Sequence, residues 1–225
     1  MDTEIRLTAG EARMLGVLVE KALTTPEQYP LSLNAATLGA NQKSNRFPIL
    51  AMSDDEVSEA LDGLIDKQLV RKVFPGHSRV DKYAHTGTSA LKVEIAQLAV
   101  LAELLMRGPQ THNELRTRVS RMIAIESPAH LDALLAPLEA RGLVERIPAG
   151  HGSRVERHVQ CLSPGLHALD APGPAGVAAE GAPEEVHAPT RAALGDRIAA
   201  LEETVERLER QLRGLAGKLG EPLGE

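Results

Sequence analysis

The sequence contains one structural module twice, and this duplication constrains the fold more than any other feature. Ser127 follows Ser53 by 74 residues, and the apolar positions after each serine match at the same offset. The first copy then reads GHSRVDKY at residues 76–83, and the second reads GHGSRVERH at residues 150–158. Because a duplicated unit folds as a unit, the chain is expected to be a tandem binding or assembly module rather than a single catalytic centre. The matched positions are Ser53, Val57, Ala60, Leu61, Leu64, Leu69, Val70 and Val73 with Ser127, Leu131, Leu134, Leu135, Leu138, Leu143, Val144 and Ile147.

Helix-start signals are repeated as well. Three capping boxes are predicted where Thr8, Ser53 and Thr111 each precede a glutamate by three residues, and Pro128 follows Ser127 at the first position of another helix. A helical apolar pattern also recurs 83 residues on, so that Glu103 stands where Glu20 stands. Each copy therefore predicts three helices, of which the second runs over about 34–42 in the first copy. Two strands are expected to close each copy, at Leu69–Phe74 and Arg79–His85, then at Leu143–Ile147 and Arg154–Cys161.

Three helices closed by a two-stranded hairpin are typical of a winged helix, the helix-turn-helix variant with a β wing. The predicted fold class is mainly α with small β wings (α+β), with two tandem winged-helix domains at residues 1–88 and 89–162. Pro137 falls inside the third helix of the second copy, where the first copy has Gly63. An interior proline costs about 3 kcal/mol or bends the helix, so a kink or a restarted turn is expected there. How the two domains pack is left open by these patterns.

The C-terminal part of the chain changes composition. Residues 163–189, rich in proline, glycine and alanine, are expected to form a flexible linker. A heptad seam follows, and residues 190–220 are expected to form a coiled-coil helix. β-Branched residues at its early a positions with leucine at d favour a parallel two-stranded coil and hence a homodimer, although the helix could instead fold back on the winged domains. The expected dimerisation residues are Leu194, Ile198, Leu201, Val205, Leu208, Leu212 and Leu215.

Composition excludes several classes of protein. The chain of 225 residues is 43% hydrophobic and 25% charged, which is ordinary globular composition. It has no apolar run of about 18 residues and no signal-peptide layout, so a cytoplasmic location without membrane contact is expected. The single cysteine, Cys161, excludes an intramolecular disulfide and a multi-cysteine zinc site, and it is expected to be a small buried apolar residue.

Specific motifs add a resemblance. The run LSLNAATLGANQKSNR at residues 31–46, then SRVDKY at 78–83 and RGPQTHNELRTR at 107–118, closely resembles the YceH family of uncharacterised bacterial proteins over about residues 5–162. The resemblance implies two consecutive winged-helix domains, in agreement with the repeat pattern. It implies no established activity.

The third helices decide between nucleic acid and protein as partner, because a winged helix usually reads DNA with this helix in the major groove. In the first copy its outer face would present Asp55, Ser58, Glu59, Asp62 and Asp66. Carboxylates there would repel phosphates. The equivalent face of the second copy offers Ala129, Asp132, Ala133, Ala136 and Ala140, with no arginine, lysine, asparagine or glutamine to read a base edge. The first choice is therefore a non-enzymatic protein-interaction or regulatory assembly module, whose partners are a second copy of itself and an unidentified protein.

Direct binding of duplex DNA is the alternative, with phosphates contacted by basic residues outside the third helices. Residues 1–88 carry 10 basic and 12 acidic residues, and residues 89–165 carry 9 and 8, so neither copy is strongly basic. The basic residues could equally be solvated positions that pair across strands. The candidate nucleic-acid-binding residues are Lys43, Arg46, Arg79, Lys82, Arg118, Arg121, Arg154 and Arg157.

Catalysis and metal binding have little support in the sequence. His77 and His151 are repeat-related, but each lies in a glycine-containing turn without a matched nucleophile. The spacing of His151, His158 and Cys161 fits no structural zinc pattern, and His112 and His130 are expected on helix surfaces. No enzyme activity, cofactor, metal or small-molecule substrate is expected.

Overall fold

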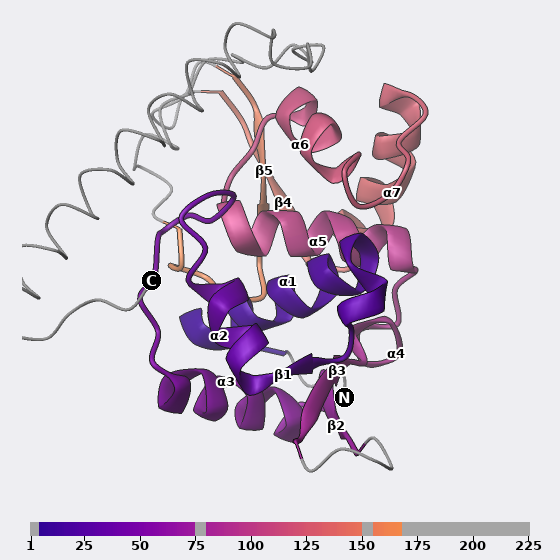
Figure 1. Cartoon of the computed structure of the whole chain (residues 1–225). Coiled ribbons are helices and arrows are strands. Elements are labelled where there is room, and N and C mark those ends of the chain that lie inside the picture. Colours follow the sequence, from indigo (N-terminus) through magenta and orange to yellow (C-terminus); the bar gives the residue numbers. More distant parts are fainter. Residues whose placement is uncertain (1–4, 75–79, 150–154, 168–225) are drawn as a thin grey trace, which may run out of the picture. The chain divides into compact units, whose positions relative to one another are not determined.

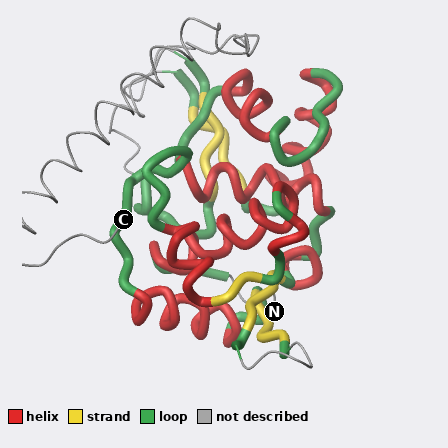
Figure 2. The backbone as a smooth tube through the Cα atoms, in the orientation of Figure 1, coloured by secondary structure: helices red, strands yellow, loops and turns green. Residues whose placement is uncertain are grey.

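The computed structural model describes residues 5–74, 80–149 and 155–167 (Figure 1), and these contain seven α-helices, one 3-10 helix and five strands. Helices dominate and the strands form small antiparallel sheets (Figure 2), which agrees with the predicted α+β class. The first copy comprises α1 (Ala9–Thr24), η1 (Pro26–Gln28), β1 (Leu31–Ser32), α2 (Leu33–Ala40), α3 (Asp54–Asp66), β2 (Val70–Val73) and β3 (Lys82–His85). After α4 (Gly87–Leu91), the second copy comprises α5 (Ile95–Arg107), α6 (His112–Val119), α7 (Pro128–Ala140), β4 (Val144–Ile147) and β5 (Arg157–Gln160).

The helices begin where their capping chemistry predicts. The Thr8, Ser53 and Thr111 side chains each accept a hydrogen bond from the backbone N–H of the glutamate three residues later, and all three capping boxes are complete. Ser127 caps α7, with Pro128 in its first turn. Since a capping box needs only residues within one turn, these starts could be predicted locally. A further box, Glu94 with Gln97 at the start of α5, was not anticipated.

Three expectations about local structure need correction. Helix α2 begins at Leu33, one residue before the expected start, because the Ser32 side chain accepts a hydrogen bond from the Ala35 N–H at 3.3 Å. Helix α7 continues through Pro137 to Ala140, so of the two expected outcomes, a kink or a restarted turn, the restarted turn does not occur. The carbonyl of Ala133, which loses its helical donor to the proline, belongs to an exposed residue and can bond water. The strands are also shorter than expected at their ends.

Two antiparallel sheets complete the copies. The first has the order β1-β3-β2, with Leu31 opposite Tyr83 and Val70 opposite His85. The second pairs β4 with β5, placing Val144 opposite Gln160. In the first sheet the third strand is β1, which directly precedes α2 in the chain.

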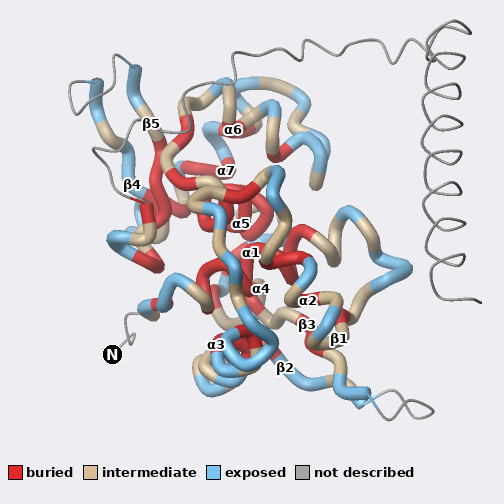
Figure 3. The backbone as a smooth tube through the Cα atoms, turned by 60° about the vertical axis from the view of Figure 1, so that its left-hand side comes forward, coloured by how far each residue is buried: buried red, intermediate tan, exposed pale blue. Residues whose placement is uncertain are grey.

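The two copies share one hydrophobic core. Helix α1 packs against α5, and their buried residues belong to the same cluster (Figure 3). Close approach of the helices requires Gly16, because a Cβ at this position would lie 2.6 Å from Cγ of Met106. Residues on α5 are buried without a break from Leu98 to Met106. The described residues of both copies therefore belong to a single compact unit.

Residues 163–167, assigned above to the linker, are partly buried. Ser163 is 4% exposed and His167 is 3% exposed, and the Ser163 N–H donates to Oε1 of Gln160 at 2.8 Å. Residues 168–189 and the coiled-coil segment 190–220, with all its expected dimerisation residues, lie outside the described residues. None of the helices in the described part of the chain is long and apolar enough to cross a bilayer.

Candidate functional site

Arg46, predicted to contact phosphate, is instead buried in an internal ion pair. Arg46 lies in the loop after α2, and its side chain is paired with Glu20 of α1. Nη2 of Arg46 lies 2.5 Å from Oε2 of Glu20, and Nη1 lies 3.4 Å from Oε1. Arg46 also donates to the Gly39 carbonyl at 3.2 Å and to Oε1 of Gln42 at 2.9 Å. The residue is only 5% exposed. The burial and the ion pair count against the predicted role of Arg46 as a nucleic-acid contact.

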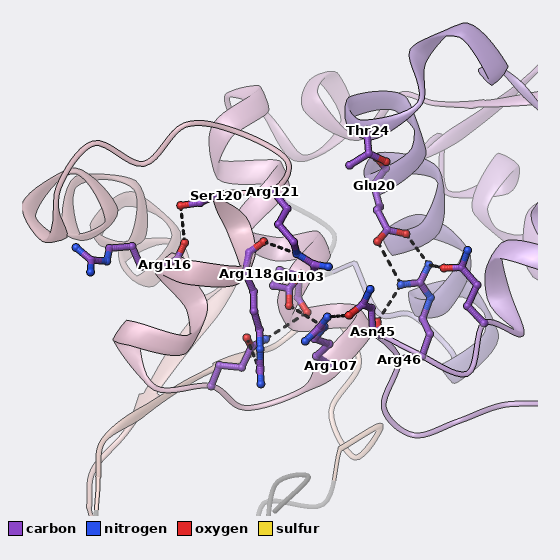
Figure 4. Close-up of polar contacts among 12 residues, drawn as sticks. Glu20, Thr24, Asn45, Arg46, Glu103, Arg107, Arg116, Arg118, Ser120 and Arg121 are labelled. Carbon is purple, nitrogen blue, oxygen red and sulfur yellow. Dashed lines mark hydrogen bonds and ion pairs between the residues drawn. The ribbon is translucent and has the colours of Figure 1, made fainter. Parts of the chain in front are cut away.

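A second arginine cluster surrounds Glu103, the repeat counterpart of Glu20 (Figure 4). Glu103 has no exposed surface, and its carboxylate lies 3.1 Å from Nε of Arg107 and 3.7 Å from Nη2 of Arg121. Burial raises the pKa of Glu103 despite the neighbouring arginines, and burial also lowers the pKa of Arg107. Arg118 donates to Oε1 of Gln110 at 2.8 Å. Arg118 and Arg121 therefore contribute to internal contacts, although their side chains remain 25% and 45% exposed.

One loop joins the two ion-pair clusters across the copies. Arg107 of the second copy donates to Oδ1 of Asn45, which has a φ of 61°, a conformation that asparagine tolerates better than most residues. The Phe47 N–H donates to the Met106 carbonyl at 2.8 Å. Nε2 of His167 lies 2.7 Å from the Phe47 carbonyl. Residues 41–48, here called the docking loop, thus fix the first copy against the C-terminal end of α5.

This arrangement explains most of the irregular Asn-Gln-Lys-Ser-Asn-Arg run. Asn41 binds the Met52 backbone through two hydrogen bonds of 2.7 and 2.8 Å, while Gln42, Asn45 and Arg46 make the contacts described above. Lys43 is exposed. The Asn-Gln-Lys-Ser-Asn-Arg motif, which is the most specific part of the resemblance, therefore serves mainly to hold the fold together.

Arg13 was missed by the sequence analysis, because its place in α1 shows no signal of burial. The side chain is fully buried and donates to the carbonyls of Ala40 at 3.1 Å and Pro48 at 2.5 Å. Desolvation, with a smaller contribution from the positive charge of Arg46, lowers the pKa of Arg13 to about 10. Arg13 thereby holds both ends of the docking loop.

Two basic residues of the hairpins are paired with carboxylates. Lys72 lies 3.6 Å from Asp62, and Arg146 lies 3.4 Å from Glu139 and 3.3 Å from Glu156. Lys82 and Arg157 are half-buried on β3 and β5. Arg79 and Arg154 lie outside the described residues. Among the described candidates only Arg46 is buried, whereas Lys43, Lys82, Arg118, Arg121 and Arg157 are at least partly exposed.

The outer faces of both third helices agree with the sequence. On α3 the four core positions Val57, Ala60, Leu61 and Leu64 are buried, and the opposite carboxylates Asp55, Glu59, Asp62 and Asp66 are exposed. We call these four carboxylates the acidic face. On α7 the five predicted outer positions, Ala129, Asp132, Ala133, Ala136 and Ala140, are all exposed.

A pocket of about 410 Å³ adjoins the acidic face. It opens between the start of α1, the first half of α3 and the segment before α3. We call it the α1/α3 pocket. Its lining residues are Thr8, Gly10, Glu11, Leu50, Met52, Glu56, Glu59 and Ala60.

Two of the described histidines lie beside carboxylates. Nε2 of His112 lies 3.1 Å from Oδ1 of Asp132, and Nδ1 of the buried His158 lies 3.3 Å from Oε1 of Glu139. Burial lowers the pKa of His158. Cys161 is half-exposed, contrary to the expected burial, and desolvation raises the pKa of its thiol. His77 and His151 lie outside the described residues. Over the described ranges, no group of three or more histidine, cysteine, aspartate or glutamate side chains is placed to hold a metal ion.

Comparison with known proteins shows close relatives across the whole chain. A family described as "Protein of unknown function, DUF480" matches residues 7–163. A UPF0502 protein of Aeromonas hydrophila is 40% identical over 225 residues, covering 97% of this chain and 98% of the relative. A UPF0502 protein of Geotalea uraniireducens is 48% identical over 162 residues, covering 71% of this chain and 74% of the relative. A third, from Shewanella sp. (strain MR-7), is 38% identical and covers 96% of this chain and 100% of the relative.

Proposed function

The chain belongs to the DUF480 family, which is the UPF0502 or YceH family of uncharacterised proteins, and we propose that it is a tandem winged-helix protein that recognises other proteins without catalysis. In each copy three helices precede an antiparallel hairpin, and this is the element order of a winged helix. On this assignment α3 and α7 are the helices that would enter a DNA major groove.

The acidic face carries the choice of a protein partner. Asp55, Glu59, Asp62 and Asp66 all project from the helix that would have to approach phosphates. Phosphate binding requires cations that replace condensed counterions. Meanwhile Arg46 is buried against Glu20. Attraction for a partner with basic groups on its surface follows from the same charges.

Comparative affinity capture with the full chain tests this function. A variant with Asp55, Glu59 and Asp66 changed to lysine should lose specific partners that the wild type retains. The control changes three other exposed carboxylates, Glu27, Glu126 and Glu145, to lysine and therefore has the same net charge. Circular dichroism checks that both variants are folded. If both variants capture the same partners as the wild type, the acidic face has no role in recognition.

Duplex DNA is the second candidate partner, and one observation favours it. Arg107, Arg118 and Arg121 outnumber the two carboxylates paired with them, those of Glu103 and Glu114, which leaves local positive charge. Fluorescence anisotropy with random-sequence duplex at about 50 and 200 mM salt would detect phosphate contacts as a steep fall in affinity. If the hairpins contact the phosphates, replacing Arg79, Lys82, Arg154 and Arg157 by glutamate should abolish this binding.

Self-association is proposed to occur through the heptad seam of residues 190–220. A dimer would present two acidic faces to a partner, which would raise avidity if both can engage at once.

A further inference from the structure

The α1/α3 pocket has a wall that is fixed before any ligand arrives. Asn41 holds the Met52 backbone from both sides, donating to its carbonyl and accepting from its N–H at 2.7 and 2.8 Å. Gly10 keeps the floor open, because a Cβ there would lie 3.2 Å from Cε of Met52 and 3.3 Å from Cβ of Ala60. Binding to such a preformed site costs less conformational entropy than binding to a mobile surface.

The pocket combines an apolar floor with a negatively charged rim. Leu50, Met52 and Ala60 supply the apolar surface. Glu59 is exposed and has no ion-pair partner among the described residues. Glu56 accepts hydrogen bonds from Ser53 with Oε2 alone, and these bonds lower the pKa of its carboxyl, so the group is ionised at neutral pH. Only Glu11 is neutralised within the pocket, by Lys67.

From this lining we infer that the α1/α3 pocket receives a lysine or arginine side chain from a basic, partly apolar segment of a protein partner. The aliphatic stem would cover Met52 and Ala60 while the cation reaches Glu56 and Glu59, which is how long basic side chains combine apolar and charged contacts. This inference rests on the proposed function and adds the chemistry of the partner.

Two other occupants fit the charge less well. Phosphate groups would meet the unpaired carboxylate of Glu59. The chain's own C-terminal segment, residues 168–225, carries 6 basic and 11 acidic residues and hence a net charge of −5. A separate basic segment is the complementary partner.

The inference is tested by measuring how tightly the full chain binds each member of an array of labelled 12-residue peptides. The peptides contain lysine, arginine, leucine and alanine in varied order. The strongest lysine-containing peptide is then remade with 2,4-diaminobutyrate in place of lysine and measured at pH 6.5, which keeps the charge but shortens each stem by two methylenes. Because each buried methylene is worth about fourfold in affinity, a lysine held in the pocket should lose about 15-fold. Unchanged affinity would mean that only surface charge attracts the peptide, and would overturn the inference.

Matched variants locate the binding. Glu59→Gln should weaken the peptide at least about fivefold, the loss of one charge-assisted contact, whereas Asp66→Asn, an equal charge change at the far end of the same helix, should have less than a twofold effect. Equal effects of both variants, or no binding by any peptide, would overturn the pocket assignment. Partner loss by the acidic-face variant in affinity capture would still support the proposed function, so the two ideas can fail separately. Preference for duplex DNA over every peptide would refute both.

Discussion

Replacing Arg46 by methionine tests whether the Glu20–Arg46 pair is structural. Methionine keeps much of the aliphatic volume but removes five hydrogen bonds, including both to the Glu20 carboxylate. Glu20 would then be a nearly buried carboxylate, with its side chain 10% exposed and only Lys21 nearby at 3.7 Å. Breaking a buried pair on one side costs about 3–5 kcal/mol. At about 2–4 °C per kcal/mol for a protein of this size, the Tm should fall by roughly 6–20 °C.

Calorimetry and urea unfolding of the full chain measure this change. Lys43→Met is the matched control, because Lys43 belongs to the same loop but is exposed, and it should alter stability by less than about 0.5 kcal/mol. The double variant Glu20→Met with Arg46→Met should recover part of the loss, since no unpaired charge is left. A loss below about 1 kcal/mol in Arg46→Met, or one equal to that of Lys43→Met, would refute the structural role.

Three further predictions concern other parts of the chain. Pro137→Ala should stabilise the protein by about 1–2 kcal/mol in urea unfolding, because the helix regains a hydrogen bond while the unfolded chain gains some freedom; a destabilised variant would contradict this. The pKa of Glu103 is raised above 4.5 in the folded state, so the folded protein binds the proton more tightly and stability should fall as pH rises from about 4.5 through the folded pKa. Glu103→Gln should remove this dependence from a pH series of urea unfolding, and an unchanged profile would assign it to another group. Val205→Asp with Leu208→Asp should give a monomer in sedimentation, whereas a monomeric wild type would exclude the coiled-coil dimer.

The burial pattern of α1 shows what the sequence could not predict. The helical spacing of its apolar residues places Met14, Leu15, Leu18 and Val19 on one face, and these residues are buried. In the structure, however, burial is continuous from Glu11 to Glu20, because α5 packs against α1 in addition to the elements of the first copy. An apolar pattern with a period of 3.6 residues predicts which face of a helix is buried against one set of neighbours. It does not predict that a second element will cover the opposite face.

The sequence by itself determined the duplication, which is a repeat of the residue pattern. It also determined the starts of α1, α3, α6 and α7 and the opposite apolar and acidic sides of α3, because these depend on residues within a few turns of each other. Only the tertiary structure decided which charged side chains remain exposed and can contact a partner. Arg46 meets Glu20 across 26 residues and Asn45 meets Arg107 across 62, so an arginine in an apparently polar loop becomes an internal ion pair. Whether a charge is buried depends on the surfaces that close over it and on the partner they bring, since burial without a partner would cost too much free energy.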